Sequence, residues 1–168
     1  EQTGVVLLTY SVVYALLSPF MGRLSERRSP RVLCCMGMAS AAMACLFFAL
    51  TLNNRALWPT LVYLAWLGVS YSLFISPLNN LIMGLAPVDE LGEVSGVIKT
   101  LTNLSFVLGV AVFETLFSLG IPSGLLHEAI PAEDIVHGFR RALICGAAVC
   151  CVAVVFNARI RPAANPTQ

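Results

Sequence analysis

Apolar residues fill five long runs of the chain, and short polar segments separate these runs. A helix needs roughly 20 residues to cross a bilayer core about 30 Å thick. Backbone groups cannot remain unpaired in lipid, and the period-two alternation of a membrane barrel is absent. The pattern predicts an all-α membrane protein with five transmembrane helices, over residues 4–21, 32–52, 57–86, 94–119 and 139–158.

The polar segments predict the connections between these helices. Pro131 precedes Glu133 and Asp134, which is typical of a helix start, so we expect a short helix there that runs into the fifth span. The predicted connections are residues 22–31, 53–56, 87–93 and 120–138, and a polar tail covers residues 159–168.

Positive charge is concentrated in the first connection, which holds Arg23, Arg27, Arg28 and Arg31. Short Lys/Arg-rich loops of membrane proteins stay on the cytoplasmic side. We therefore expect residues 22–31, residues 87–93 and the tail to be cytoplasmic, and the other two connections to be outside the cell.

Composition agrees with the membrane assignment. The chain is 58% hydrophobic and 11% charged, whereas soluble domains are about 25% charged. Basic patches interleaved with exposed aromatics are absent, so nucleic acid is not an expected partner. The six cysteines all lie in apolar runs, without CxxC spacing or a nearby histidine. We interpret them as small apolar side chains and expect no metal and no cofactor.

The first connection resembles the loop signature of the major facilitator superfamily, Gly-x-Leu-(Ala/Ser)-Asp-Arg-x-Gly-Arg-Arg. Glu26 stands for the usual Asp, and Ser29-Pro30 replaces the usual Gly-Arg. The resemblance implies a carboxylate that meets a helix N-terminus across the domain interface and holds one transport state closed. The alternative is a basic loop that only sets the topology. The residues assigned to this lock are Gly22, Glu26, Arg27 and Arg31.

Residues 68–117 carry a longer resemblance. They contain Gly68, the step Pro77-Leu78-Asn79-Asn80, Ser95-Gly96, Thr100-Leu101 and Leu108-Gly109-Val110-Ala111. This series is similar to the penultimate helix pair of the fourteen-helix drug:proton antiporters in the same superfamily. Many relatives have Arg-Gln where this chain has Thr102-Asn103, so no role of that arginine is carried over.

The resemblance implies a partial C-terminal half of a secondary transporter in the cell membrane, which is the inner membrane in a Gram-negative source. The implied activity is proton-coupled efflux of drug-like amphipathic molecules by alternating access, as in multidrug resistance. The chain begins Glu1-Gln2-Thr3-Gly4 without methionine, and we interpret it as a fragment whose partner is the missing N-terminal half. The alternative is a small polytopic membrane subunit or membrane enzyme without transport activity. Motifs of nucleotide-binding, metalloprotease or hydrolase sites are absent from the sequence, so we expect no enzyme.

The third span carries an aromatic and hydroxyl stripe at helical spacing. We expect Tyr63, Trp66, Ser70 and Asn80 to line a substrate cavity, and Pro77 to kink the helix. The alternative is an ordinary helix–helix interface, in which Ser70 bonds back to its own helix.

Two ionisable residues fall inside the fourth span. Lys99 lies about 7 Å into it, and we expect its side chain to extend back to the cytoplasmic face. Glu114 lies about 30 Å along the span and is the candidate for proton coupling. Small residues, Gly96 and Gly109 among them, predict close helix packing, either against the opposite half or within this one.

Overall fold

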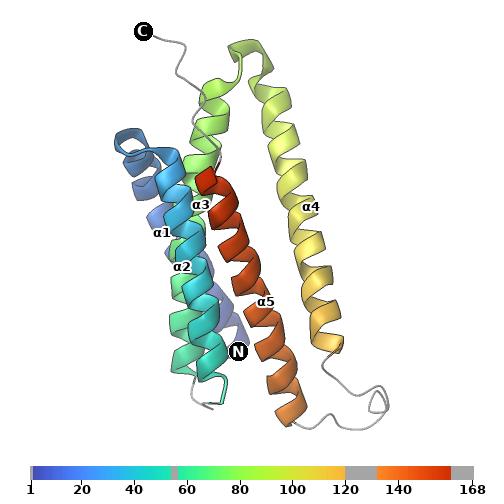
Figure 1. Ribbon diagram of the computed structural model, residues 1–168. Coiled ribbons are helices and arrows are strands. Elements are labelled where there is room, and N and C mark those ends of the chain that lie inside the picture. The colour runs from blue at the N-terminus through green and yellow to red at the C-terminus, as the bar shows by residue number, and fades with distance from the viewer. Residues whose placement is uncertain (1, 54–56, 120–131, 160–168) are drawn as a thin grey trace.

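The computed structural model describes residues 2–53, 57–119 and 132–159, and these form five long helices and one short one (Figure 1). The all-α fold expected from the sequence is confirmed, because every long apolar run is helical and the described residues contain no strand. The expected membrane crossing over residues 4–21 stays a prediction, because α1 is not among the helices of the described residues that are long and apolar enough to cross a membrane. The helices are α1 (Gln2–Arg27), α2 (Pro30–Thr51), α3 (Trp58–Leu85), the 3₁₀ helix η1 (Val88–Glu90), α4 (Leu91–Ser118) and α5 (Ala132–Arg159).

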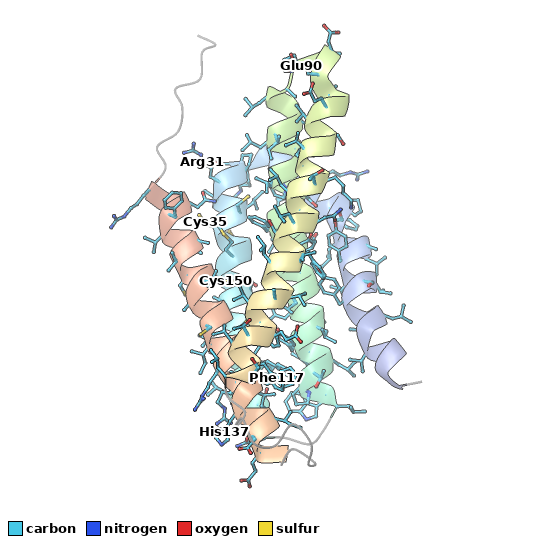
Figure 2. All side chains as sticks on the ribbon, turned by 90° about the vertical axis from the view of Figure 1, so that its right-hand side faces the viewer. Arg31, Cys35, Glu90, Phe117, His137 and Cys150 are labelled. Carbon is cyan, nitrogen blue, oxygen red and sulfur yellow. The ribbon has the colours of Figure 1, made fainter. Side chains whose placement is uncertain are left out.

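The long helices run alongside one another, and the chain changes end at each connection (Figure 1). The α1–α2 turn and η1 lie at the same end of the helices, as the topology prediction requires. Figure 2 places Arg31 and Glu90 toward that end and His137 at the opposite one. Which of the two ends faces the cytoplasm stays a prediction.

The helices extend further than the apolar runs that predicted them. α1 continues to Arg27 and α2 begins at Pro30, so most of the connection expected over residues 22–31 is helical. Pro30 fits there because the first turn of a helix needs no backbone donor. α5 begins at Ala132, which confirms the helix start expected before the fifth span. The expected tail over 159–168 lies outside the described residues beyond Arg159.

Most of the packing involves α1, α2, α3 and α5. α3 packs against both α1 and α2, and α2 also packs against α5. α4 contacts chiefly α5 and η1, and it has no buried residue. In Figure 1, α4 accordingly stands apart from the α1–α2–α3 group.

Large apolar side chains cover the outside of the helices. Leu50 is 82% exposed and Phe106 is 76% exposed, which a soluble monomer would not tolerate over so wide a surface. Among the described residues, α2, α3, α5 and the segment Val88–Ser118 are long and apolar enough to cross a membrane. The chain is therefore built as a multi-pass membrane protein.

Glycines set how closely the helices approach. A Cβ on Gly37 would lie 2.9 Å from the Ser70 carbonyl oxygen, and one on Gly68 would lie 3.0 Å from the Tyr10 carbonyl oxygen. Gly138 plays the same part against the ring of Phe117. By contrast, a Cβ built on Gly96 or Gly109 has no described atom within 4 Å, apart from its chain neighbours and the nearby backbone of its own helix. Their predicted close packing is therefore absent among the described residues, and packing against an opposite half stays a prediction.

Pro77 lies inside α3, which continues as a helix on both sides of it. Its side chain is among the fully buried ones. The kink expected at this position stays a prediction.

Candidate functional site

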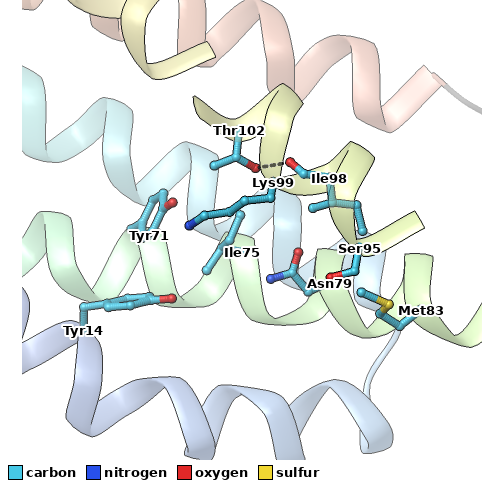
Figure 3. A pocket seen from close by; sticks show the side chains of 9 residues that line it. All are labelled: Tyr14, Tyr71, Ile75, Asn79, Met83, Ser95, Ile98, Lys99 and Thr102. Atoms are coloured by element: carbon cyan, nitrogen blue, oxygen red, sulfur yellow. Dashed lines mark hydrogen bonds between the residues drawn. The ribbon is translucent and has the colours of Figure 1, made fainter. Parts of the chain in front are cut away.

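A pocket of about 270 Å³ lies between α1, α3 and α4 (Figure 3). α1 contributes one tyrosine, α3 contributes residues at every fourth position, and α4 contributes residues from its N-terminal half. Side chains four apart share one helix face, so α3 presents a single stripe to the pocket. The lining residues are Tyr14, Tyr71, Ile75, Asn79, Met83, Ser95, Ile98, Lys99 and Thr102.

The side chain of Lys99 enters this pocket. Figure 3 shows its amine pointing toward Tyr71, away from Met83 and Ser95, which lie nearer the η1 end. Lys99 therefore does not extend toward the η1 end, which is the end that the topology prediction places in the cytoplasm. The hydroxyls of Tyr14 and Tyr71 and the amide of Asn79 give the amine polar surroundings deeper along the helix.

Three tyrosines cluster where α1 meets α3, and two of them, Tyr14 and Tyr71, line the pocket. The rings of Tyr14 and Tyr71 lie 5.3 Å apart, and Tyr10 stacks against Tyr14 at 6.5 Å. Tilted and stacked rings at these distances attract one another, so the cluster fixes the two pocket tyrosines. Their hydroxyls point into the pocket (Figure 3).

An apolar cavity of about 450 Å³ adjoins the polar pocket. The two share Tyr71, Ile75, Ile98 and Thr102. The remaining lining of the second cavity is almost entirely apolar and includes Phe74, Leu78, Ile82, Leu101 and Phe106. A polar pocket beside an apolar one is a suitable shape for an amphipathic molecule.

Three residues of the predicted stripe on α3, Tyr63, Trp66 and Ser70, lie against α2 and outside this pocket. Trp66 Nε1 donates to Ser40 Oγ at 2.9 Å, and Ser70 Oγ lies 2.9 Å from both Ser40 Oγ and the Trp66 carbonyl oxygen. The ring of Tyr63 stacks on Phe48 with centroids 4.3 Å apart. The hydrogen bond from Ser70 to its own helix agrees with the alternative given in the sequence analysis, an ordinary helix–helix interface. Contact of these side chains with a ligand stays a prediction.

Asn80 of α3 is hydrogen-bonded to residues 22–27 at the end of α1, which begin the loop signature and are called the signature segment. Asn80 Nδ2 donates to Ser25 Oγ at 2.9 Å and to the Gly22 carbonyl oxygen at 3.4 Å. Ser25 Oγ itself donates to the Gly22 carbonyl oxygen at 2.7 Å. The side chains of Glu26 and Arg27 lie outside the described ones, and the lock assigned to them and to Arg31 stays a prediction.

Glu114 lies in the last two turns of α4 and is exposed. It lines neither the polar pocket nor the apolar cavity beside it. Its proton-coupling role stays a prediction. The six cysteines are free thiols, from buried Cys34 to exposed Cys151, as their interpretation as small apolar side chains requires.

Sequence reasoning missed Tyr14, Tyr71 and Asn79. Tyr71 and Asn79 lie eight residues apart on one helix face, and Lys99 follows Ser95 by four on the next helix. Polar residues spaced by four or eight positions on each of two consecutive spans would have indicated a polar pocket between those spans.

The family follows from comparison with known proteins. A sequence model of the Major Facilitator Superfamily matches residues 1–167. This chain belongs to the Major Facilitator Superfamily. Both resemblances found in the sequence agree with this assignment, and members of the superfamily are transporters.

Curated relatives of the chain are bacterial transport and resistance proteins. Riboflavin transporter RibZ of Clostridioides difficile is 26% identical over 117 residues, which are 70% of this chain and 26% of that protein. Lincomycin resistance protein LmrB of Listeria monocytogenes is 26% identical over 167 residues, 96% of this chain and 36% of that protein. Multidrug resistance protein Stp of Mycobacterium tuberculosis is 25% identical over 132 residues, 77% of this chain and 24% of that protein.

The chain therefore spans well under half the length of these relatives. No solved structure gives a significant match.

Proposed function

We propose that this chain is the C-terminal part of a secondary transporter that exports drug-like amphipathic small molecules from the cell. The pocket between α1, α3 and α4 carries the proposal, because it places polar groups beside an apolar cavity within membrane-spanning helices. The resistance proteins among the relatives support export rather than uptake.

The proposal assigns ligand contact to Tyr14, Tyr71, Asn79 and Lys99. Trp66 and Ser70 instead hold α3 against α2, through the bonds to Ser40, and thereby fix the face that α3 presents to the pocket. The exposed face of α4 receives the N-terminal half of the transporter, which completes the cavity. Alternating access then follows from rocking of the two halves.

Proton coupling is assigned to Glu114, an acidic side chain in an otherwise apolar part of α4. Carboxylates within transmembrane helices commonly relay protons in transporters. The signature segment at the end of α1 contributes the conformational lock through Glu26, and Asn80 holds that segment in place.

Export of Nile red, an uncharged amphipathic dye, tests the proposal. The protein is expressed in the form its host makes, in cells that lack their own drug exporters. We expect faster loss of the dye than in empty cells, and abolition by a protonophore. Tyr71→Ala should slow export several-fold because it removes a pocket wall, whereas Leu50→Ala, on an exposed apolar surface, should not.

A protein that moves neither Nile red nor any other amphipathic dye would favour the rival reading as a membrane subunit or membrane enzyme. Retained export in Tyr71→Ala, with Leu50→Ala unchanged, would place the ligand outside this pocket.

A further inference from the structure

We propose that the pocket between α1, α3 and α4 recognises organic acids, and that Lys99 binds their anionic group. The inference rests on the proposed function, since it names the class of amphipathic molecule that the same pocket takes. Lys99 is the only lysine of the chain, and it lies eight residues into α4, about 12 Å along the helix.

The charge of Lys99 is not balanced within the part of the chain that the structure describes. Its amine makes no hydrogen bond and no ion pair with another described residue. None of the residues that line the pocket is acidic. Lys99 is exposed, so the feature that matters is not burial but the lack of a counter-charge on the pocket wall, and a carboxylate brought by a ligand would supply that charge.

The neutral polar groups of the pocket also suit an acid. The hydroxyls of Tyr14 and Tyr71 point into the pocket and are not hydrogen-bonded to described residues (Figure 3). They can donate to the second oxygen of a carboxylate that the amine already holds. Asn79 Oδ1 is buried and lacks a hydrogen-bond partner, so it favours a ligand that also carries a hydroxyl or N–H donor.

The adjoining apolar cavity can hold the part of such a molecule that carries no charge. It is lined by Phe74, Leu78 and Phe106, and it shares Tyr71 with the polar pocket. An aromatic or aliphatic body would lie there while the acid group reaches Lys99. The ligand class that binds most tightly is therefore an amphipathic organic acid with a hydrogen-bond donor, and uncharged amphipathic molecules bind through the apolar cavity alone.

Binding of a matched pair of fluorescent probes tests the inference. The probes are 7-hydroxycoumarin-3-carboxylate and its carboxamide, titrated by fluorescence polarisation against the protein in nanodiscs, in the form its host expresses. The buffer is weakly acidic, about pH 5.5, so that the 7-hydroxyl of both probes is protonated and only the carboxylate is charged. We expect the acid to bind at least about tenfold more tightly than the amide, the usual effect of a charged hydrogen bond. Lys99→Gln should remove this preference and Lys99→Arg should retain it. Thr100→Val changes a neighbouring exposed side chain outside the pocket and should leave the preference unchanged.

A second measurement uses the unaltered protein and does not depend on the folding of a variant. Trinitrobenzenesulfonate modifies lysine amines, and mass spectrometry reports the modification of Lys99. The carboxylate probe should slow this modification, and the carboxamide should not. Equal binding of the two probes, a preference that survives Lys99→Gln, or unprotected Lys99 would each overturn the inference.

The outcomes separate this inference from the proposed function. An acid preference that depends on Lys99, in a protein that exports no Nile red, would refute export alone. Nile red export by a protein that does not distinguish the two probes would refute the inference alone. If an acidic side chain of another helix neutralises Lys99, Lys99→Gln weakens both probes equally, which also counts against the inference.

Discussion

Replacement of Gly37 by alanine tests the packing that orients α3. The added Cβ would lie 2.9 Å from the Ser70 carbonyl oxygen and 3.0 Å from the Phe74 amide nitrogen. Ordinary contact begins at 3.4 Å, and both neighbours are backbone atoms that no side-chain rotation can move. α2 and α3 must therefore separate by about half an ångström, and overpacking of this kind costs about 1–3 kcal/mol.

The control for this substitution is Gly96→Ala, because a Cβ there meets no described atom within 4 Å. Alanine is also the better helix former, so this variant should be neutral or slightly more stable. The assay is thermal unfolding of the purified protein in detergent, followed by tryptophan fluorescence. If Gly37→Ala unfolds at the same temperature as Gly96→Ala, the described α2–α3 contact is refuted.

Three further substitutions test other contacts and the coupling proposal. Asn80→Leu removes the hydrogen bonds to Ser25 and Gly22, so backbone hydrogen exchange over residues 22–27 should be about fivefold faster. The control Asn103→Leu, on the exposed face of α4, should leave this exchange unchanged, and equal exchange in the two variants would contradict the link between Asn80 and the end of α1. Arg140→Gln weakens the hydrogen bonds to the Ala49 carbonyl oxygen and to Asn53 Oδ1, so it should destabilise the protein by about 1–3 kcal/mol in the same thermal assay. Substitution of its exposed neighbour, Arg141→Gln, provides the control, and equal unfolding temperatures of the two variants would contradict the contact of Arg140 with Ala49 and Asn53. Glu114→Gln should abolish the response of dye export to a pH gradient while leaving probe binding in the pocket unchanged, and a retained response would remove Glu114 from the coupling mechanism.

The existence of the helices could be predicted from the sequence because apolar runs of this length have few other structures in lipid. The start of α5 was also predictable, since Pro131 and the acids after it are a local signal. The length of an apolar run and the residues at a helix start are both properties of one segment. They determine whether that segment is a helix, whichever helices become its neighbours.

The rotation of each helix was not predictable in the same way. Tyr63, Trp66 and Ser70 form a polar aromatic stripe that suits either a ligand or a neighbouring helix, and the structure gives them α2 as a neighbour. The pocket instead uses Tyr71 and Asn79, and Asn79 is only one residue from the predicted Asn80. One residue turns a helix by about 100°, so a small error in the chosen face exchanges one neighbour for another.

The glycines show the same limit. A small residue permits close approach, but the sequence does not show which helix approaches it. Gly96 and Gly109 were predicted to pack closely, whereas the close contacts lie at Gly37, Gly68 and Gly138. Lys99 differs for another reason, because the polar residues that share its pocket come from α1 and α3, which its own helix does not specify.

A cryo-electron microscopy structure of the protein as its host expresses it, with a transported molecule bound, tests the central claim most directly. The account predicts ligand density between α1, α3 and α4, in contact with Tyr71 and within hydrogen-bonding distance of the Lys99 amine. Density against Trp66 and Ser70 on the α2 side of α3, or density confined to the outer surface of α5, would contradict it.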